Sequence, residues 1–439
     1  MKLNKLGRGA LASIVSVALG LGLTACSRDY VLSYVYVTNA KPASAGATNG
    51  AVTAYAVDYL QGTLTPLPDS PIAAGKNPVT DVATPNGQTL YVINHDDSTV
   101  MQFSIGTDGK LYLKNTVNIT GSFPTAAAVD ATGTFLYVTF TYQVGPNNTQ
   151  LYSPASPGPG GVTVFKIGSD GSLTPQSTTN VGMNPIAIAI SRPVCATINT
   201  GGASATNCEL TGATSNNGYY NTFVYVVDQE PQPNATVLGF TQNTSTGALT
   251  PAPGTTITTV AGKTVATGYA AGVAPSAVAV DPSTRFVYVT DQLTNQLYGF
   301  NITTGGGLST MVSSPFATGQ FPVAVTIDPR GLYMYVANKN SGTISAYAID
   351  AKSGSPSGTV GSTATTVGTQ PTCIGIDPSL GIYTYVSNNL DASVSALQLN
   401  PHNGALTTIQ NSPFPSSGLP TCLAVVAASN QHPTQFVVQ

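Results

Sequence analysis

Charged side chains are scarce in this chain of 439 residues. Asp, Glu, Lys and Arg together make up 8% of it, against roughly 25% in an ordinary soluble domain. Beyond residue 25 there are 12 Lys and Arg against 18 Asp and Glu, which gives a net charge of −6. A chain without a basic patch or a run of arginines has little with which to neutralise a phosphate backbone. We therefore expect no nucleic-acid partner.

The motifs of common catalytic and metal sites are also missing. The three histidines and five cysteines show no zinc-ligand spacing, and the chain has neither a Gly-x-Ser-x-Gly elbow nor a phosphate-binding loop. We accordingly expect no cofactor and no metal ion, and the sequence alone assigns no nucleophile–base pair.

The first residues are typical of an export signal. Three basic residues precede an apolar stretch over 10–23, which is too short and too rich in glycine for a good membrane span. It ends in Leu23-Thr24-Ala25-Cys26, which resembles the bacterial lipobox, and Ser27 in place of Asp favours the outer membrane. We predict a signal peptide over 1–25 and a lipid anchor on Cys26 that holds the protein in the cell envelope. An ordinary secretory signal with an incidental cysteine is the alternative.

A repeat dominates the rest of the chain. A Tyr-Val pair and a proline each recur seven times, and the tyrosine follows the proline by 13 residues in four units and by 14 in another. In the unit that begins at Pro185 the interval is 40 residues, because a segment is inserted. The tyrosines are Tyr36, Tyr91, Tyr137, Tyr225, Tyr288, Tyr335 and Tyr385, and the prolines are Pro78, Pro124, Pro185, Pro275, Pro322, Pro371 and Pro420.

Each unit predicts four strands, which we call a to d. Small and large residues alternate after the proline, as over 277–280, and a turn such as Asp328-Pro329 follows. The Tyr-Val strand comes next, then a third strand such as 343–349, a Gly-x-Leu turn such as Gly404-Ala405-Leu406, and a weaker fourth strand. Four antiparallel strands in a repeat of about 45–50 residues form one blade of a β-propeller.

The phase of the repeat predicts how the ring closes. The chain starts with a Tyr-Val strand that lacks its inner strand, and it ends with an inner strand, 421–426, that lacks its blade. Pairing the two ends removes the last open sheet edge. We therefore predict an all-β, seven-bladed propeller over 33–428 with four-stranded antiparallel blades, closed by the C-terminal strand. Its flanks are a lipidated linker, 26–32, and a tail, 429–439. The inserted loop is 191–219, and we expect a monomer.

The signature Tyr36-Val37-Thr38-Asn39 carries a family resemblance. Together with the recurring Pro … Asp-Pro … Tyr-Val pattern, it is similar to the YVTN/lactonase-type seven-bladed propellers, a group that includes 6-phosphogluconolactonase-like proteins. The resemblance spans nearly the whole mature chain. It implies the fold, whereas one fold carries many functions.

Candidate site residues follow from the loops on one face of the propeller. The d–a and b–c connections emerge on the face conventionally called the top. There the segments 40–50, 141–161 and 229–234 are long insertions, and the connection 251–274 is long as well. The densest charge is at 94–98, where a base or metal ligand stands beside two carboxylates, or where a solvated turn simply carries them. The candidate top-face charges are Lys41, Lys76, His95, Asp96, Asp97, Asp228, Glu230, Asp291 and Lys339.

Asp81 is an unusual residue of an innermost strand. A buried carboxylate must be hydrogen-bonded, reach water or have a perturbed pKa, and we expect Asp81 to meet water in the central channel. Asp81 and His95 are the candidate catalytic residues. The other units carry Ala127, Ile188, Val278, Val325, Ile374 and Leu423 at the position of Asp81.

The four cysteines beyond Cys26 predict disulfides in an oxidising compartment. Cys195 and Cys208 both lie in the inserted loop, where a bond would close a short excursion. Cys373 and Cys422 occupy the same position of adjacent repeats. A bond between them would fasten the ring at its closure, and two small buried thiols are the equal alternative.

Arginine placement decides the functional preference. Lactonases that this fold resembles hold the substrate carboxylate or phosphate with arginines, whereas Arg28 lies beside the lipid anchor. The sequence therefore favours a non-catalytic envelope scaffold that binds a protein, glycan or small ligand on its top face. A lactonase-like hydrolase that uses Asp81, His95 or nearby carboxylates is the second hypothesis, and a structural surface protein is the third. The remaining arginines of the mature chain, Arg192, Arg285 and Arg330, all follow inner strands, on the bottom face.

Overall fold

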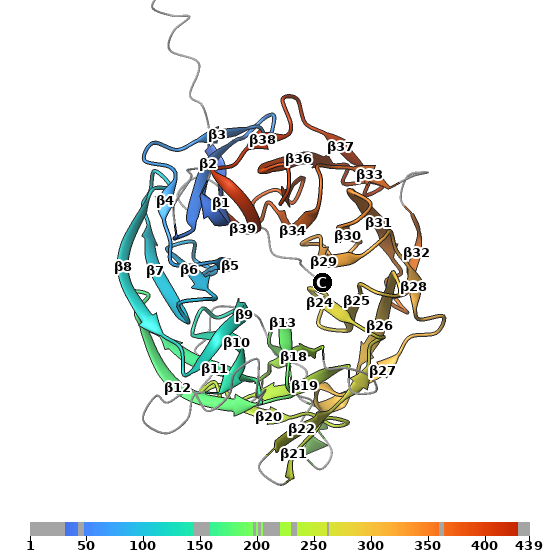
Figure 1. Ribbon diagram of the computed structural model, residues 1–439. Coiled ribbons are helices and arrows are strands. Elements are labelled where there is room, and N and C mark those ends of the chain that lie inside the picture. The colour runs from blue at the N-terminus through green and yellow to red at the C-terminus, as the bar shows by residue number, and fades with distance from the viewer. Residues whose placement is uncertain are drawn as a thin grey trace, which may run out of the picture.

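The computed structural model describes residues 31–42, 48–143, 159–195, 199–200, 203–204, 220–229, 235–260, 263–359 and 364–428. Seven of the sheets are arranged as blades in a ring (Figure 1), as predicted. Three further sheets have two strands each, and two of them lie within the inserted loop and its flanks: β14 (Val194–Cys195) with β17 (Tyr220–Asn221), and β15 (Asn199–Thr200) with β16 (Ala203–Ser204). A single 3₁₀ turn, Thr304–Gly306, is the only helical element among the described residues. No helix in this part of the chain is long and apolar enough to cross a membrane.

Each blade runs from an innermost strand a to an outer strand d. Blade 1 contains β39 (Gly418–Ala427), β1 (Val31–Pro42), β2 (Ala51–Asp58), β3 (Leu64–Pro66) and β4 (Ile72–Ala73). Blade 2 contains β5 (Pro78–Ala83), β6 (Thr89–Asn94), β7 (Thr99–Ile105) and β8 (Leu111–Asn118). Blade 3 contains β9 (Gly121–Val129), β10 (Phe135–Gln143), β11 (Gly161–Ile167) and β12 (Leu173–Asn180). Blade 4 contains β13 (Pro185–Ile190), β18 (Phe223–Asp228), β19 (Thr236–Gln242), β20 (Leu249–Pro251) and β23 (Tyr269–Ala270). Blade 5 contains β24 (Pro275–Val280), β25 (Phe286–Asp291), β26 (Gln296–Ile302), β27 (Leu308–Thr310) and β28 (Phe316–Ala317). Blade 6 contains β29 (Pro322–Ile327), β30 (Tyr333–Asn338), β31 (Thr343–Ile349), β32 (Pro356–Thr359) and β33 (Thr365–Thr366). Blade 7 contains β34 (Pro371–Ile376), β35 (Tyr383–Asn388), β36 (Ser393–Leu399), β37 (Leu406–Thr408) and β38 (Phe414–Pro415).

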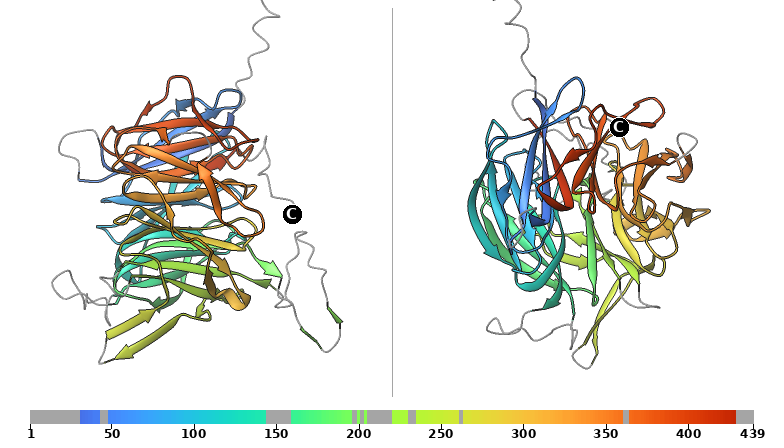
Figure 2. Two further views of the ribbon diagram at one scale, coloured as in Figure 1. Left: turned by 90° about the vertical axis from the view of Figure 1, so that its right-hand side faces the viewer. Right: turned by 45° about the horizontal axis from the view of Figure 1, so that its top comes forward.

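Five blades have a short fifth strand that the repeat pattern does not predict. In blade 1, β3 pairs only with one end of β2, and β4 pairs with Ala51 and Val52 at the other end. In blades 2 and 3, by contrast, β8 and β12 are long enough to cover strand c alone. The extra strand therefore completes the edge of strand c where strand d ends early. A separate hairpin of β21 (Thr256–Val260) and β22 (Lys263–Thr267) projects from the ring (Figure 2).

The two ends of the chain close the ring, as the repeat phase predicts. Strand β39 pairs antiparallel with β1, with Val425 opposite Val35. A disulfide joins Cys373 of β34 to Cys422 of β39 across the neighbouring inner strands of blades 7 and 1, with the Cα atoms 4.9 Å apart. The alternative of two free thiols is therefore wrong. The side chains of Cys195 and Cys208 lie outside the described residues, as does Cys26.

A ring of hydrogen bonds links the seven repeated tyrosines to the next blade. Each hydroxyl donates to the carbonyl of the glycine in the following blade's c–d turn, and each of these glycines has a positive φ between 66° and 85°. A carbonyl buried between blades would be costly without a hydrogen-bond donor. The Tyr-Val motif and the Gly-x-Leu motif therefore supply the donor and the acceptor of the same interblade contact. The pairs are Tyr36–Gly109 at 2.7 Å, Tyr91–Gly171 at 2.7 Å, Tyr137–Gly247 at 2.8 Å, Tyr225–Gly306 at 3.0 Å, Tyr288–Gly354 at 2.6 Å, Tyr335–Gly404 at 2.8 Å and Tyr385–Gly62 at 2.9 Å.

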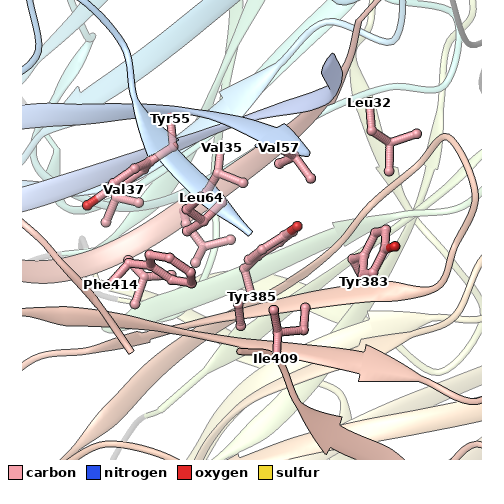
Figure 3. Packing of buried hydrophobic residues seen from close by; sticks show 13 residues of the cluster. Leu32, Val35, Val37, Tyr55, Val57, Leu64, Tyr383, Tyr385, Ile409 and Phe414 are labelled. Carbon is pink, nitrogen blue, oxygen red and sulfur yellow. The ribbon is translucent and has the colours of Figure 1, made fainter. Parts of the chain in front are cut away.

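A second ring covers the same glycine in six of the seven blades. The residue two positions before the tyrosine is aromatic, and a Cβ on the glycine would collide with its ring. Figure 3 shows the cluster in which Tyr383 and Tyr385 of blade 7 pack with Val57 and Leu64 of blade 1. Burying such apolar surface between blades is the main stabilising contribution to the ring. The exception is Thr89 in blade 2.

Polar side chains at the two ends of strand b fix the turns. On the bottom face, Asp328 Oδ1 accepts the amides of Leu332 and Tyr333 at 2.7 and 2.8 Å, which confirms the predicted role of Asp in these turns. On the top face, Asn338 Oδ1 accepts the amide of Gly319 at 3.1 Å. Strand b of blade 6 is therefore held at both of its ends.

Candidate functional site

The top face of blades 2 and 3 carries a group of charged and aromatic side chains in contact with one another. Strand β5 begins at Pro78, so the residues before it lie in the d–a connection beside the b–c turn that follows β6. His95 N donates to Asn77 O at 3.0 Å and Asp96 N to Lys76 O at 3.3 Å, and these bonds hold the two loops together. The His95 cluster comprises Lys76, Asn77, His95, Asp96, Asp97, Phe123 and Tyr142.

His95 and Asp96 form a close pair. His95 Nδ1 lies 2.6 Å from Asp96 Oδ1, and Asn77 Nδ2 donates to the same oxygen at 3.2 Å. Desolvation acts to raise the pKa of the Asp96 carboxyl. The hydrogen bonds from His95 and Asn77, with the charges of His95 and Lys76, outweigh this effect and lower it. Asp96 is therefore ionised at neutral pH and can only accept, so the proton of this contact belongs to His95 Nδ1.

Lys76 is tied to the same loop by Asp97. Its amide donates to Asp97 Oδ2 at 2.6 Å, and its Nζ lies 3.8 Å from Asp97 Oδ1. The Lys76 side chain is 54% exposed, so the ammonium remains available to an anionic group in solvent. An exposed pair of this kind contributes little to stability.

Two aromatic residues that the sequence did not indicate form a wall beside His95. The ring centroids of His95 and Phe123 are 5.1 Å apart, and Tyr142 meets Phe123 edge-on at 5.7 Å. Phe123 has a φ of 56°, an uncommon conformation for a bulky residue, and its amide donates to Ser98 Oγ at 3.1 Å. The available signal was its place directly before Pro124, at the start of an innermost strand.

Asp81 lies apart from this cluster, between blades 1 and 2. Its side chain is 3% exposed, so the expectation that it meets channel water is wrong. Thr38 Oγ1 lies 3.5 Å from Oδ1, and Oδ2 has no hydrogen-bond partner among the described residues. Burial raises the pKa of the Asp81 carboxyl to about 8, although the backbone of Ala424 and the Thr38 hydroxyl act to lower it. A carboxyl in this state is mostly protonated at neutral pH, and its contacts lead away from His95.

Asp228 and Asp291 are placed inside the blades and not on the top surface. Both are fully buried. Asp228 Oδ1 accepts the amide of Asn184 at 2.9 Å, and Asp291 accepts the amides of Val273 at 2.7 Å and Ala274 at 3.0 Å. They occupy the position of Asn338 in blade 6, so they fix the d–a connection as that asparagine does.

The remaining candidates do not join the His95 cluster. Lys339 lines a separate top-face pocket of about 360 Å³ between blades 6 and 7. Glu230 and the side chain of Lys41 lie outside the described residues. Arg285 and Arg330 donate to the carbonyls of Ala351 and Pro401 on the bottom face. No group of three or more His, Cys, Asp or Glu that would suit a metal ion occurs among the residues that the structure describes.

Comparisons with known proteins agree with this architecture. A proposed 6-phosphogluconolactonase from Bacteroides uniformis superposes with a TM-score of 0.64 at 17% identity, over 90% of this chain and 100% of that one. The periplasmic gluconolactonase of Pseudomonas aeruginosa gives 0.63 at 18% identity, over 90% and 99%. A functionally unknown protein from Desulfotomaculum acetoxidans gives 0.59 at 11% identity, over 90% and 99%. At these identities the likeness shows the fold.

No curated protein matches the sequence. The model of the family described as Lactonase, 7-bladed beta-propeller, matches residues 48–140 and 215–376. Because this match covers more than half of the chain, the protein belongs to the seven-bladed β-propeller Lactonase family.

Proposed function

We propose that the His95 cluster hydrolyses an uncharged lactone, with His95 as the general base. The observation that carries this proposal is the 2.6 Å contact between His95 Nδ1 and Asp96 Oδ1 at the rim of the ring. Because the ionised Asp96 holds the proton on Nδ1, Nε2 presents a lone pair that can take a proton from water. Asp96 is thus a positioning residue for His95.

The cluster supplies what lactone opening requires. Water attacks the lactone carbonyl and forms a C–O bond as its proton passes to His95 Nε2. The charge that develops on the carbonyl oxygen is stabilised by the Lys76 ammonium. The ring C–O bond then breaks, and His95 returns the proton to the departing oxygen. The sum is one lactone and one water converted to one hydroxy acid, which ionises in solution.

The surroundings favour an uncharged sugar lactone over a phosphorylated one. The aromatic wall of Phe123 and Tyr142 suits the apolar face of a sugar ring. No arginine among the described residues lies on the top face to grip a phosphate with two parallel bonds. Membership of the Lactonase family and the fold shared with a gluconolactonase support the reaction class. The sequence alone favours a binding scaffold over a hydrolase. The close pair of His95 and Asp96 is the reason that we place the hydrolase first.

A binding scaffold in the cell envelope remains the second candidate. Apolar side chains are exposed on the top turns of blades 5 and 7, where Leu293 is 60%, Leu390 57% and Val273 43% exposed. Such residues are compatible with a protein or glycan partner. Because β1 begins at Val31 on the bottom face, where Val31 pairs with Asp58, a lipid anchor at Cys26 would leave these top turns free for such a partner.

The test is hydrolysis of aldonolactones with and without a phosphate group, followed as acid release above the spontaneous rate. We expect turnover of an uncharged lactone. His95→Gln should lower kcat by about 10²–10⁴-fold, the usual contribution of a general base, and Asp96→Asn should lower it less. Lys339→Gln, in the separate top pocket, is the matched control and should leave the rate unchanged. A rate equal to spontaneous hydrolysis in buffer, or a rate unchanged in His95→Gln, would contradict this proposal and favour the binding scaffold.

A further inference from the structure

Blade 2 breaks the aromatic pattern of the ring, and a cavity lies where it does so. Thr89 stands where the other six blades have Tyr or Phe two residues before the repeated tyrosine. A cavity of about 510 Å³ on the bottom face between blades 2 and 3 is lined by Thr89 and by Gly171, the glycine that an aromatic ring covers elsewhere. Thr89 and the buried side chain of Gln102 cover Gly171 in place of the ring, and the hollow lies beside them. Its volume lies within the usual range of small-ligand sites.

The lining of this cavity is polar and carries hydrogen-bonding groups at its surface. Asn86, Gln88, Thr107 and Ser169 contribute amides and hydroxyls. Asn86 Nδ2 donates to Gln88 Oε1 at 3.2 Å, which leaves the Gln88 Nε2 amine without a partner among the described residues. Hydrogen bonds from the hydroxyl and amide of Ser172 lower the pKa of the Asp170 carboxyl. Asp170 is therefore an ionised acceptor, and the lining residues include no cation.

An exposed tyrosine stands at the rim of the cavity. Tyr112 pairs with Ser104, which lines the cavity, and directly paired residues present their side chains on the same face of a sheet. That face points toward blade 3, because Gln102, two residues before Ser104, donates to the carbonyl of Asp170 at 3.0 Å. The Tyr112 ring lies next to Gly106 of the lining, and the side chain is 50% exposed.

We propose that this bottom-face cavity binds an uncharged saccharide unit. A sugar presents C–H groups to an aromatic ring and hydroxyls that both donate and accept, which matches Tyr112 together with the amide and hydroxyl lining. Asp170, the one ionised residue of the lining, accepts hydrogen bonds from sugar hydroxyls and repels anions. The site is on the face opposite the His95 cluster and is independent of the hydrolysis proposed there.

A glycan array and calorimetric titration test this inference. The arms are uncharged oligosaccharides, the same backbones with uronic acids, and sulfated chains, each probed with the full-length protein. We expect binding to uncharged saccharides only. Thr89→Phe introduces the residue type of the other blades at the wall of the cavity, so it should abolish binding in a protein that remains folded.

Tyr112→Ala should weaken binding at least tenfold. Leu113→Ala, the adjacent residue of β8, which is also exposed, is the matched control and should leave the affinity unchanged. Binding that survives in a folded Thr89→Phe protein, preference for the anionic chains, or no uncharged saccharide bound anywhere on the array would each overturn the proposal. None of these results bears on lactone turnover at His95.

Discussion

Removing one tyrosine hydroxyl from the interblade ring should destabilise the propeller by a definite amount. In Tyr288→Phe the aromatic ring remains between Phe286 and Met334 in the core, so the packing is preserved. What is lost is the 2.6 Å hydrogen bond to Gly354 O, an acceptor buried between blades 5 and 6. Leaving a buried carbonyl without its donor costs about 1–3 kcal/mol. We expect the free energy of unfolding to fall by about 1–2 kcal/mol.

The assay is equilibrium unfolding in guanidinium chloride, followed by circular dichroism. Tyr112→Phe is the matched control, because Tyr112 is half exposed and its hydroxyl makes no hydrogen bond among the described residues. It should unfold at the same denaturant concentration as the wild type. If Tyr288→Phe also unfolded like the wild type, the tyrosine–glycine bond would not be what the repeat encodes.

Three further predictions concern pH and redox state. Burial raises the pKa of the ring tyrosines such as Tyr225 and Tyr335 above 10.0. The unfolded chain then loses protons first, so stability should fall steeply above pH 10, and the tyrosinate absorbance of these buried tyrosines should appear only together with unfolding. The pKa of Asp81 is raised from 3.8 to about 8, so this carboxyl stays protonated in the folded protein while it ionises in the unfolded chain. The free energy of unfolding of the wild type should therefore fall as pH rises from about 4 to 8. In Asp81→Asn the melting temperature should lose this pH dependence, and the variant should be more stable than the wild type by a few kcal/mol at pH 8. Loss of the Cys373–Cys422 bond, which closes a segment with a sequence separation of 49, should cost about 4 kcal/mol; a Cys373→Ser, Cys422→Ser double variant that unfolded like the wild type in denaturant would contradict this.

The fold was predictable from the sequence because the repeat carries its own interblade contacts. The seven tyrosines and the glycines of the Gly-x-Leu turns were visible as separate signals, and the structure shows that each tyrosine bonds the glycine of the next blade. Ring closure followed from the phase of the repeat, since the chain starts without an inner strand and ends with one, and β39 pairs with β1. The fifth strands were not predictable, because they depend on how far strand d reaches along strand c.

The candidate site was only partly predictable. Charge density drew attention to His95 and Asp96, but Phe123 comes from the next blade, and only the folded ring brings it against the histidine. Asp291 misled the prediction because an acidic residue at a loop carries the same sequence signal whether it faces solvent or caps buried amides. The side chain of Asp81 turned out to be buried because its strand packs against β1 and β39, a contact set by tertiary structure.

The most direct test of the proposed chemistry is the initial rate of acid release from an uncharged aldonolactone, measured for the wild-type protein and for His95→Gln at neutral pH. Our account predicts a wild-type rate well above the spontaneous one and a loss of about 10²-fold or more in the variant, at an unchanged melting temperature. Equal rates in the two proteins would contradict it and would show that the contact between His95 and Asp96 has no part in turnover.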